Sequence, residues 1–270
     1  MFYFVATPIG NLKDFSLRAI EILKEADLIL CEDTRTSLKL LYHYELNKPL
    51  DSFHKFNYRE KTPFVISELK KGKNLCLISD AGTPCISDPG QELISAFKEN
   101  KIKYSIIPGA CAFVNAFALS GFETPLTFVG FLPNNKKERR DLLSNLKTYK
   151  STLAFYSATH SIFDDLQEFY EEFGNREVCI VRELTKMFEE IVFFNLAEKL
   201  NFEQKGEFVV LIKGADTLSN ELNNLSIMEH YNYYINIKLA PNDAIKQVAK
   251  DRRLPKNQIY NEIVKLKNNK

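Results

Sequence analysis

The first half of the chain alternates short apolar runs with stretches of helical periodicity. The apolar runs are Phe2–Ala6, Leu28–Cys31, Leu75–Ile78 and Tyr104–Ile107, and the helical stretches are Leu12–Lys24, Ser37–Tyr44, Gln91–Glu99 and Ala112–Leu119. Short apolar strands that alternate with amphipathic helices are typical of a mostly parallel sheet with helices on both faces. The sequence therefore predicts an α/β domain.

Each predicted strand is followed by a loop rich in Gly, Pro and polar residues. These loops are TPIGN (7–11), EDTRT (32–36), SDAGTPCISDPG (79–90) and PGA (108–110). Parallel strands bring their carboxyl ends to one edge of the sheet, which is where such folds bind ligands. Gly82 and Gly109 would let the backbone approach a ligand, and Pro84 and Pro108 would stiffen the bent loops.

The type of ligand is narrowed by the motifs that the sequence lacks. The absence of G-x-G-x-x-G argues against a standard dinucleotide site, and the absence of G-x-x-x-x-G-K-[ST] excludes a P-loop. Five scattered cysteines without a C-x-x-C spacing argue for a reducing cytoplasm and against a disulfide framework or a zinc cluster. No metal site, secretion signal or membrane span is expected.

Charge is distributed unevenly along the 270 residues. The net charge is +1, but residues 236–270 hold nine Lys or Arg and three Asp or Glu, a balance of +6 that leaves −5 for the rest. A basic tail on a mildly acidic body suggests an anionic polymer as partner, although a solvated helix face explains the charge equally well.

The pattern of this tail is helical. Pro241 and Pro255 suit the first positions of two helices, with Arg252, Arg253 and Leu254 as the turn between them. Two short helices with a tight turn resemble a helix-turn-helix. We favour a grip on nucleic-acid phosphates over a helical hairpin that only caps the body.

Seven motifs follow one another along nearly the whole chain. They are TPIGNL, EDTR, SDAGTPCISDPG, PGACA, GFLP (130–133), RELTK (182–186) and KGEFVVLIKG (205–214). In this order they resemble the class III, tetrapyrrole-methylase-like methyltransferases that depend on S-adenosyl-L-methionine. Within that family the chain is similar to the enzymes that methylate the 2′-oxygen of a cytidine ribose in the decoding region of 16S rRNA.

The resemblance implies a fold, a cofactor and a partner. It implies two α/β domains with S-adenosyl-L-methionine in the cleft between them, usually as a cytoplasmic homodimer, with 16S rRNA or the 30S subunit as substrate. The expected parts are residues 1–121, residues 122–215 and a basic helical module over 225–270. The second domain is expected to contain strands Thr152–Tyr156, Val178–Val181 and Glu207–Ile212 and the helix Ile162–Phe173.

The matching motifs also imply site residues. Those expected to bind the cofactor are Pro8, Gly10, Asp80, Gly82, Thr83, Pro84, Ile86, Pro108, Gly109, Ala110, Tyr156, Leu184 and Gly206. Those expected to contact RNA are Arg252, Arg253 and Lys256. One segment departs from the family pattern: residues 156–161 read YSATHS where the family usually has a Tyr-Glu-Ser-Pro-His-Arg-like sequence, so only His160 keeps its counterpart near the end of the segment.

The reaction explains the charged motifs. Methyl transfer to a ribose is an in-line displacement in which the hydroxyl must lose its proton, so a base or a neighbouring cation is needed. The expected catalytic residues are Glu32, Asp33, Arg35, Glu183 and Lys186. An ion pair that ties the EDTR loop to the body is the competing interpretation of the first three, and the sequence leaves the identity of the base open.

Two other functions remain as alternatives. One is a tetrapyrrole methyltransferase on the same fold, against which the basic tail and the EDTR motif argue. The other is an RNA-binding or assembly factor without catalysis, against which the intact SDAGTP and PGA loops argue.

Overall fold

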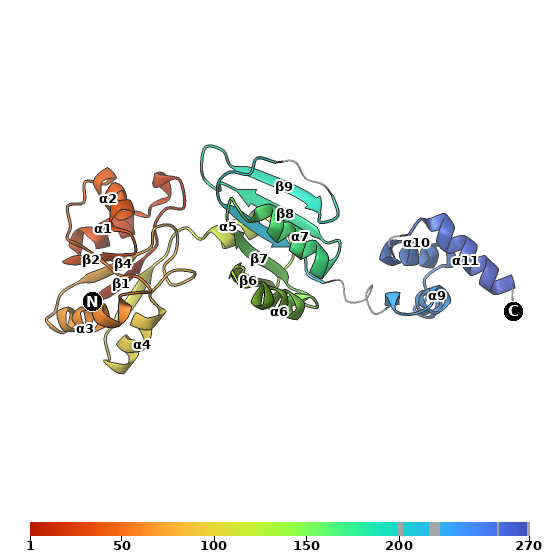
Figure 1. The fold of residues 1–270 in the computed structure, drawn as a ribbon, viewed down its shortest axis with the longest axis horizontal. Coiled ribbons are helices and arrows are strands. Elements are labelled where there is room, and N and C mark those ends of the chain that lie inside the picture. The colour runs from red at the N-terminus through yellow and green to blue at the C-terminus, as the bar shows by residue number, and fades with distance from the viewer. Residues whose placement is uncertain (199–201, 216–221, 253, 269–270) are drawn as a thin grey trace.

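The computed structural model describes residues 1–198, 202–215, 222–252 and 254–268 (Figure 1). They form two α/β domains, each built on its own five-stranded sheet, followed by a small helical module. The α/β class predicted from the sequence is confirmed. Among the described helices, none is long and apolar enough to cross a membrane.

The first sheet is parallel throughout. Its strands are β1 (Phe2–Val5), β2 (Leu28–Cys31), β3 (Leu50–Ser52), β4 (Leu75–Ile78) and β5 (Tyr104–Ile107), in the order β3-β2-β4-β1-β5. Phe2 of β1 lies opposite Leu75 of β4 on one side and Tyr104 of β5 on the other. All five strands therefore end at the same edge, as the sequence predicts for the four strands that it identifies.

Helices cover both faces of this sheet. They are α1 (Leu17–Glu25), α2 (Thr34–His43), α3 (Tyr58–Lys70) and α4 (Gln91–Glu99). Successive residues of a strand point to opposite faces. Val5 and Ile29 accordingly share a buried cluster with α1 and α2, whereas Phe4 and Leu30 share one with α3 and α4.

The helix predicted over Leu12–Lys24 is divided in two. Leu12–Asp14 forms a short 3₁₀ turn, η1, and α1 begins only at Leu17. The hydroxyl of Ser16 accepts a hydrogen bond from the backbone N–H of Ala19 at 3.1 Å. Serine is a strong N-cap residue, so the regular helix starts immediately after it.

The second sheet is mixed. Its strands are β6 (Leu126–Phe131), β7 (Thr152–Ser157), β8 (Glu177–Arg182), β9 (Glu190–Asn195) and β10 (Phe208–Ile212), in the order β6-β7-β10-β8-β9. Only β6 and β7 run parallel, and the other neighbouring strands are antiparallel. One face carries α6 (Lys136–Leu146) and α7 (Ile162–Phe173), around a core that includes Phe155 and Phe169.

The opposite face of the second sheet is covered by α5 (Ala112–Ser120), which packs on β7 and β10 (Figure 1). Ala116 of α5 is fully buried in a cluster with Ala154 and Val209 of that sheet. The chain therefore leaves the first sheet at Ile107 and joins the second through α5, which precedes the expected boundary at residue 121.

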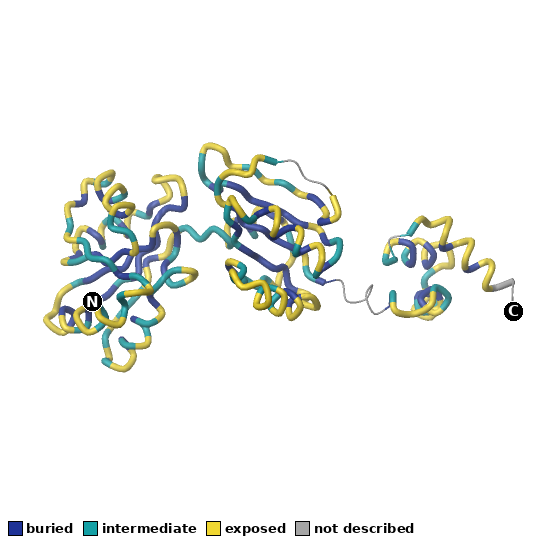
Figure 2. The backbone as a smooth tube through the Cα atoms, in the orientation of Figure 1, coloured by how far each residue is buried: buried dark blue, intermediate teal, exposed yellow. Residues whose placement is uncertain are grey.

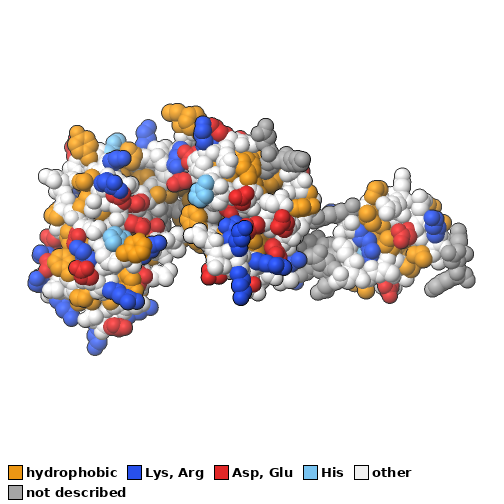
Figure 3. Space-filling view, viewed as in Figure 1, with side chains coloured by type: hydrophobic (Ala, Val, Ile, Leu, Met, Phe, Trp, Pro, Cys, Tyr) orange, Lys and Arg blue, Asp and Glu red, His pale blue; other side chains and the backbone are white. Residues whose placement is uncertain are grey.

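The helical module has a buried core of its own (Figure 2). It contains α9 (Ile227–Asn236), α10 (Pro241–Arg252) and α11 (Lys256–Asn268). The two helices expected in the basic tail correspond to α10 and α11, and α9 is a further helix that precedes them. Pro241 occupies the first position of α10, as predicted. Residues 216–221, between the expected second domain and the expected module, lie outside the described residues. Figure 3 shows side chains of both charges on the viewed face of the module and of the two domains.

A buried polar network organises the module. His230 is fully buried, with its Nε2 3.1 Å from Asp251 Oδ2 and its Nδ1 accepting a hydrogen bond from Arg252 Nε at 3.1 Å. Burial lowers the pKa of His230, with a further lowering from the Arg252 charge, although Asp251 opposes the shift. The imidazole is therefore neutral at pH 7 and is a structural residue of the fold.

Candidate active site

The loops that follow β1, β2, β4 and β5 are hydrogen-bonded to one another. The backbones of Thr7 and Gly82 exchange two hydrogen bonds, at 2.9 and 3.1 Å. The hydroxyl of Thr83 donates to the carbonyl oxygen of Ala110 at 2.9 Å. The backbone N–H of Asp33 donates to Asp80 Oδ1 at 3.3 Å. Residues from four separate motifs thus form one continuous wall at the edge of the first sheet.

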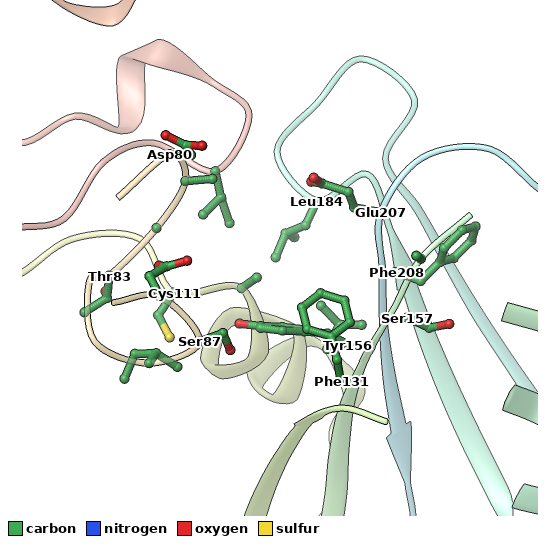
Figure 4. Close-up of a pocket in the computed structure, with 18 of the residues that line it drawn as sticks. Asp80, Thr83, Ser87, Cys111, Phe131, Tyr156, Ser157, Leu184, Glu207 and Phe208 are labelled. Carbon is green, nitrogen blue, oxygen red and sulfur yellow. The ribbon is translucent and has the colours of Figure 1, made fainter. Parts of the chain in front are cut away.

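This wall faces the second sheet across a cavity of about 470 Å³ (Figure 4). In the figure Asp80 and Thr83 lie on the side of the first domain, and Leu184, Glu207 and Phe208 lie on the side of the second. The cavity is lined by Ile9, Glu32, Asp80, Ala81, Gly82, Thr83, Ile86, Ser87, Asp88, Cys111, Ala112, Phe131, Tyr156, Ser157, Ala158, Val181, Leu184, Glu207, Phe208 and Val209.

The lining has a single sign of charge. It contains four carboxylates, and no Lys, Arg or His is found among the described residues that line it. The second-domain wall is mainly apolar and aromatic, with Tyr156 and Leu184 among its side chains. The cavity therefore suits a ligand that combines a positive charge with a flat apolar group.

Asp88 is the carboxylate that is most perturbed by this environment. Burial, and then the charges of Glu32 and Asp80, raise its pKa from an ordinary value of 3.8 to about 6. Among the described residues, none donates a hydrogen bond to its side chain. Asp88 is not among the site residues predicted from the sequence, and its only signal there is that it is the second Asp of the SDAGTPCISDPG loop.

The predicted catalytic residues of the EDTR motif divide between two places. Glu32 lines the cavity. Asp33 and Arg35 instead pair with each other at the start of α2, where Arg35 Nη2 lies 2.8 Å from Asp33 Oδ2. Hydrogen bonds from the side chain and backbone of Arg35 lower the pKa of Asp33 to about 2, so Asp33 is a poor proton acceptor at neutral pH.

The RELTK motif of the second domain forms a strained loop that reaches the first domain. Glu183 and Thr185 have positive φ angles of 49° and 68°, which only a well-supported loop maintains in non-glycine residues. The Thr185 hydroxyl accepts a hydrogen bond from the backbone N–H of Asn11 at 3.2 Å. RELTK and TPIGNL, far apart in sequence, are thereby joined at the top of the cavity.

Lys186 is held by two carboxylates of the second domain. Its Nζ lies 2.9 Å from Glu183 Oε1 and 2.9 Å from Glu207 Oε2. Burial opposes the charge of Lys186, but the two hydrogen bonds outweigh burial and raise its pKa. Lys186 is therefore a fixed cation beside the cavity and does not act as a base.

Several glycines in this region allow two segments of the chain to approach each other closely. A Cβ at Gly109 would lie 2.8 Å from Ala6 Cβ, and one at Gly206 would overlap the side chain of Glu183. Gly82 has a φ of +82°, and a Cβ there would meet Ile9 Cγ2 at 3.2 Å. The sequence predicts that Gly82 and Gly109 let the backbone approach a ligand closely. In the structure, the atoms that a Cβ would meet at these two positions belong to the protein itself.

Six of the thirteen residues expected at the cofactor line the cavity: Asp80, Gly82, Thr83, Ile86, Tyr156 and Leu184. The other seven lie outside its lining: Pro8, Gly10, Pro84, Pro108, Gly109, Ala110 and Gly206. Their assignment to the cofactor stays a prediction. Among the described residues, no cluster of three or more His, Cys, Asp or Glu side chains could hold a metal ion.

Comparison with known proteins identifies the family. The model of the tetrapyrrole (corrin/porphyrin) methylases matches residues 1–200. The chain belongs to this family. Solved structures of the family's fold include cobalt precorrin-4 methyltransferase, with a TM-score of 0.58 and 18% identity over 78% of this chain and 94% of that chain. Diphthine synthase superposes with a TM-score of 0.60 and 14% identity over 78% and 89% of the two chains.

Several curated relatives match a larger share of the chain than the family model does. The Ribosomal RNA small subunit methyltransferase I of Halalkalibacterium halodurans is 44% identical over 96% of this chain and 93% of its own length. The protein of the same name from Bacillus subtilis is 38% identical over 96% and 92%. That of Mycoplasmopsis pulmonis matches 96% of its own length to only 77% of this chain, so about a quarter of this chain has no counterpart there.

The segment that departs from the family pattern has a structural role here. Ser157 stands where the family usually has Glu, and its hydroxyl donates to Asp165 Oδ2 at 2.5 Å. In Figure 4 this hydroxyl points away from the cavity. Asp165 is in turn bound by Arg139 at 2.6 Å, so Ser157 ties β7 to the helices behind it.

The residues expected to contact RNA lie in the helical module, outside the family model. Arg252 donates to His230 and, through Nη2, to the backbone carbonyls of Leu222 and Leu225. It therefore fastens the module's entry segment to α10. Lys256 is exposed at the start of α11, and Arg253 lies outside the described residues.

Proposed function

We propose that this chain uses S-adenosyl-L-methionine to methylate the 2′-oxygen of a cytidine ribose in 16S rRNA, in the decoding region of the small ribosomal subunit. The observation that carries the proposal is the match of 96% of the chain, at 44% identity, to a relative named Ribosomal RNA small subunit methyltransferase I. The methylase family supports the reaction class.

The cavity fits this cofactor. Its volume of about 470 Å³ falls within the usual ~300–1,000 Å³ of small-molecule sites. S-adenosyl-L-methionine carries a sulfonium and an ammonium group, for which the carboxylates of Asp80 and Asp88 would be partners. Tyr156 and Leu184 offer apolar surface for an adenine ring. When bound, the cofactor would supply an electrophilic methyl group on sulfur.

The protein's contribution to the reaction is to orient the ribose and accept its proton. Glu32 and Asp88 are the cavity carboxylates that can accept it, because Glu207 is paired with Lys186 and Asp80 already accepts a hydrogen bond. Asp33, outside the lining, is held ionised by Arg35. With a pKa of about 6, Asp88 is ionised at neutral pH and still basic enough to take a proton. Lys186, held by Glu183, would place a positive charge beside the oxygen as the proton leaves.

The helical module would add affinity for RNA. We propose that its exposed lysines, Lys246, Lys250 and Lys256, contact phosphates, with Arg253 as a further candidate from the sequence. Such contacts weaken with salt, because binding releases counterions from the nucleic acid. The module would carry no chemistry, since none of its described residues lines the cavity.

We further propose a homodimer in the cytoplasm. The support is a set of exposed apolar side chains on the edge strand β5 and on α5, including Ile106, Val114 and Leu119, each between 45% and 47% exposed. Size-exclusion chromatography with light scattering tests this, and a monomeric mass at micromolar concentration would contradict it.

Methyl transfer to ribosomal subunits tests the function. Purified protein and S-adenosyl-L-methionine labelled on the methyl group are incubated with 30S subunits from cells that lack the modification. We expect label in 16S rRNA at one cytidine, in alkali-resistant form because the 2′-oxygen is blocked. Label on a carbon of a tetrapyrrole in a parallel reaction would favour that alternative, and cofactor binding without any transfer would contradict the proposal.

A further inference from the structure

Phe131 is the most exposed aromatic side chain of the cavity. It is the last residue of β6, lines the cavity and remains 59% exposed. A large apolar side chain that remains in water forgoes the stabilisation that its burial would contribute. An isolated exposed Phe would need no explanation, but one at the mouth of a reaction cavity is available to a ligand.

The backbone before Phe131 directs this side chain. The pairing of β6 with β7 shifts register between Phe128 and Gly130, and Gly130 has a φ of +81° that side chains rarely permit. Such bulges re-aim the side chains that follow them and are common beside active sites. A Cβ at Gly130 would come within 4.0 Å of Ser87 Oγ, so this bend lies against the SDAGTPCISDPG loop of the first domain.

A neighbouring ring supports Phe131 from one side. The centroids of the Phe131 and Tyr156 rings are 5.4 Å apart with an angle of 57° between the ring planes. Figure 4 shows both side chains together on the second-domain side of the cavity. The centroid of the Phe128 ring lies 5.1 Å from that of Tyr156. The position of the Phe131 ring is therefore held by packing, while its other surface stays free.

The charge of the cavity decides what that free surface can bind. Four carboxylates line the cavity, of which Glu207 is paired with Lys186, and no cation is found among the described residues of the lining, so the phosphates of an RNA strand are repelled from its interior. A nucleotide can approach only with its neutral parts, the ribose and the base, while the backbone stays outside. An aromatic face is the usual protein partner for an unstacked base.

We propose that Phe131 is the platform on which the target base stacks, which positions its ribose at the cavity while the phosphates remain at the rim. The inference rests on the proposed RNA substrate and adds the residue that receives the base. Phe131 is a substrate-binding residue in this assignment, and S-adenosyl-L-methionine does not contact it.

The test compares three substitutions in the full-length protein. In Phe131→Leu the ring is lost at similar apolar volume, in Phe131→Tyr it is kept, and Tyr170→Leu removes a 41% exposed aromatic residue from the outer helix α7 as a matched control. Stacking on aromatic side chains contributes about 1–3 kcal/mol per base. We expect kcat/KM for unmethylated 30S subunits to fall roughly tenfold or more in Phe131→Leu, and to stay within about threefold of wild type in the other two.

Cofactor affinity, measured by calorimetry, separates the competing roles. We expect the Kd for S-adenosyl-L-methionine to be unchanged in Phe131→Leu, which also shows that the variant is folded. A parallel loss of cofactor affinity would mean that Phe131 holds the adenine ring, and unchanged activity would mean that it holds nothing. Either result overturns the inference. If the wild-type protein itself methylates no rRNA, the proposed function fails first.

A fluorescent variant gives an independent readout. The chain contains no tryptophan, so Phe131→Trp introduces a single reporter at the platform. We expect S-adenosyl-L-methionine to leave its emission unchanged and a cytidine-containing RNA oligonucleotide to quench it. Quenching by the cofactor alone would contradict the assignment.

Discussion

The ionised carboxylate of Asp88 is expected to lower the stability of the ligand-free protein while it contributes to binding the cofactor. Its pKa is raised from 3.8 to about 6, mainly by burial and then by the charges of Glu32 and Asp80. A carboxyl group with a raised pKa binds a proton more readily in the folded than in the unfolded protein. Folding is therefore favoured most below about pH 4, and that contribution is lost as the pH rises towards 6.

The size of the effect follows from the shift. About two pKa units at 1.36 kcal/mol per unit set an upper bound of about 2–3 kcal/mol above pH 6, and solvent screening of this half-buried carboxyl reduces the cost to about 1–2 kcal/mol. Asp88→Asn removes this charge and keeps the shape, so the ligand-free variant should be more stable than wild type at pH 7.5. An increase in Tm of roughly 5–10 °C is expected for a domain of this size. The same variant should bind S-adenosyl-L-methionine several-fold more weakly, because a partner of its cationic groups is lost.

The assay is thermal unfolding of both proteins without ligand at several pH values between 4 and 8. The difference in Tm should be near zero at pH 4 and grow through the interval from pH 4 to 6. Asp141→Asn, at an exposed position of α6, serves as the control with the same chemical change and should behave as wild type. A difference that is independent of pH, or a variant less stable than wild type at pH 7.5, would refute this reasoning.

Three further predictions concern other parts of the molecule. Gly109→Ala should lower the unfolding free energy by roughly 1–3 kcal/mol even without ligand, because the new Cβ would lie 2.8 Å from Ala6 Cβ. An unchanged Tm would show that the loop adjusts without cost. Lys186→Ala should reduce kcat roughly hundredfold with the cofactor Kd within about threefold of wild type, and an equal loss of both would place Lys186 in the cofactor site. Arg252→Ala should destabilise the helical module, which would appear as an unfolding step at lower temperature. Lys256→Ala should leave the stability unchanged and should reduce the slope of log RNA affinity against log salt concentration by about 0.7.

The elements that the sequence predicts most accurately are the buried ones. β2, β4 and α4 have the predicted bounds, because a continuous apolar run or a clean amphipathic stripe directly reflects burial on both faces or on one. β5 also has its predicted bounds, although this edge strand is only partly buried. β9 was not identified, although its residues alternate between exposed and more buried positions as a strand at a sheet edge does. α3 was also missed, and Pro63 within it is a residue that usually argues against a helix.

The site was predictable only in part for a similar reason. The motifs bring Asp80, Gly82 and Tyr156 to the cavity because strand ends converge wherever the sheet is parallel. The environment of a carboxylate is a tertiary property, so no local pattern reveals that Asp88 is buried among like charges. Nor does a count of basic residues distinguish Arg252, which binds backbone carbonyls, from the exposed Lys256.

The short segment Pro108–Cys111 has two roles in this fold. Thr83 binds the carbonyl of Ala110, and Cys111 lines the cavity, so the segment is part of the site's wall. It is also the covalent passage from β5 to α5, and hence from the first sheet to the second. A ligand bound in the cavity therefore lies against the segment that joins the two domains.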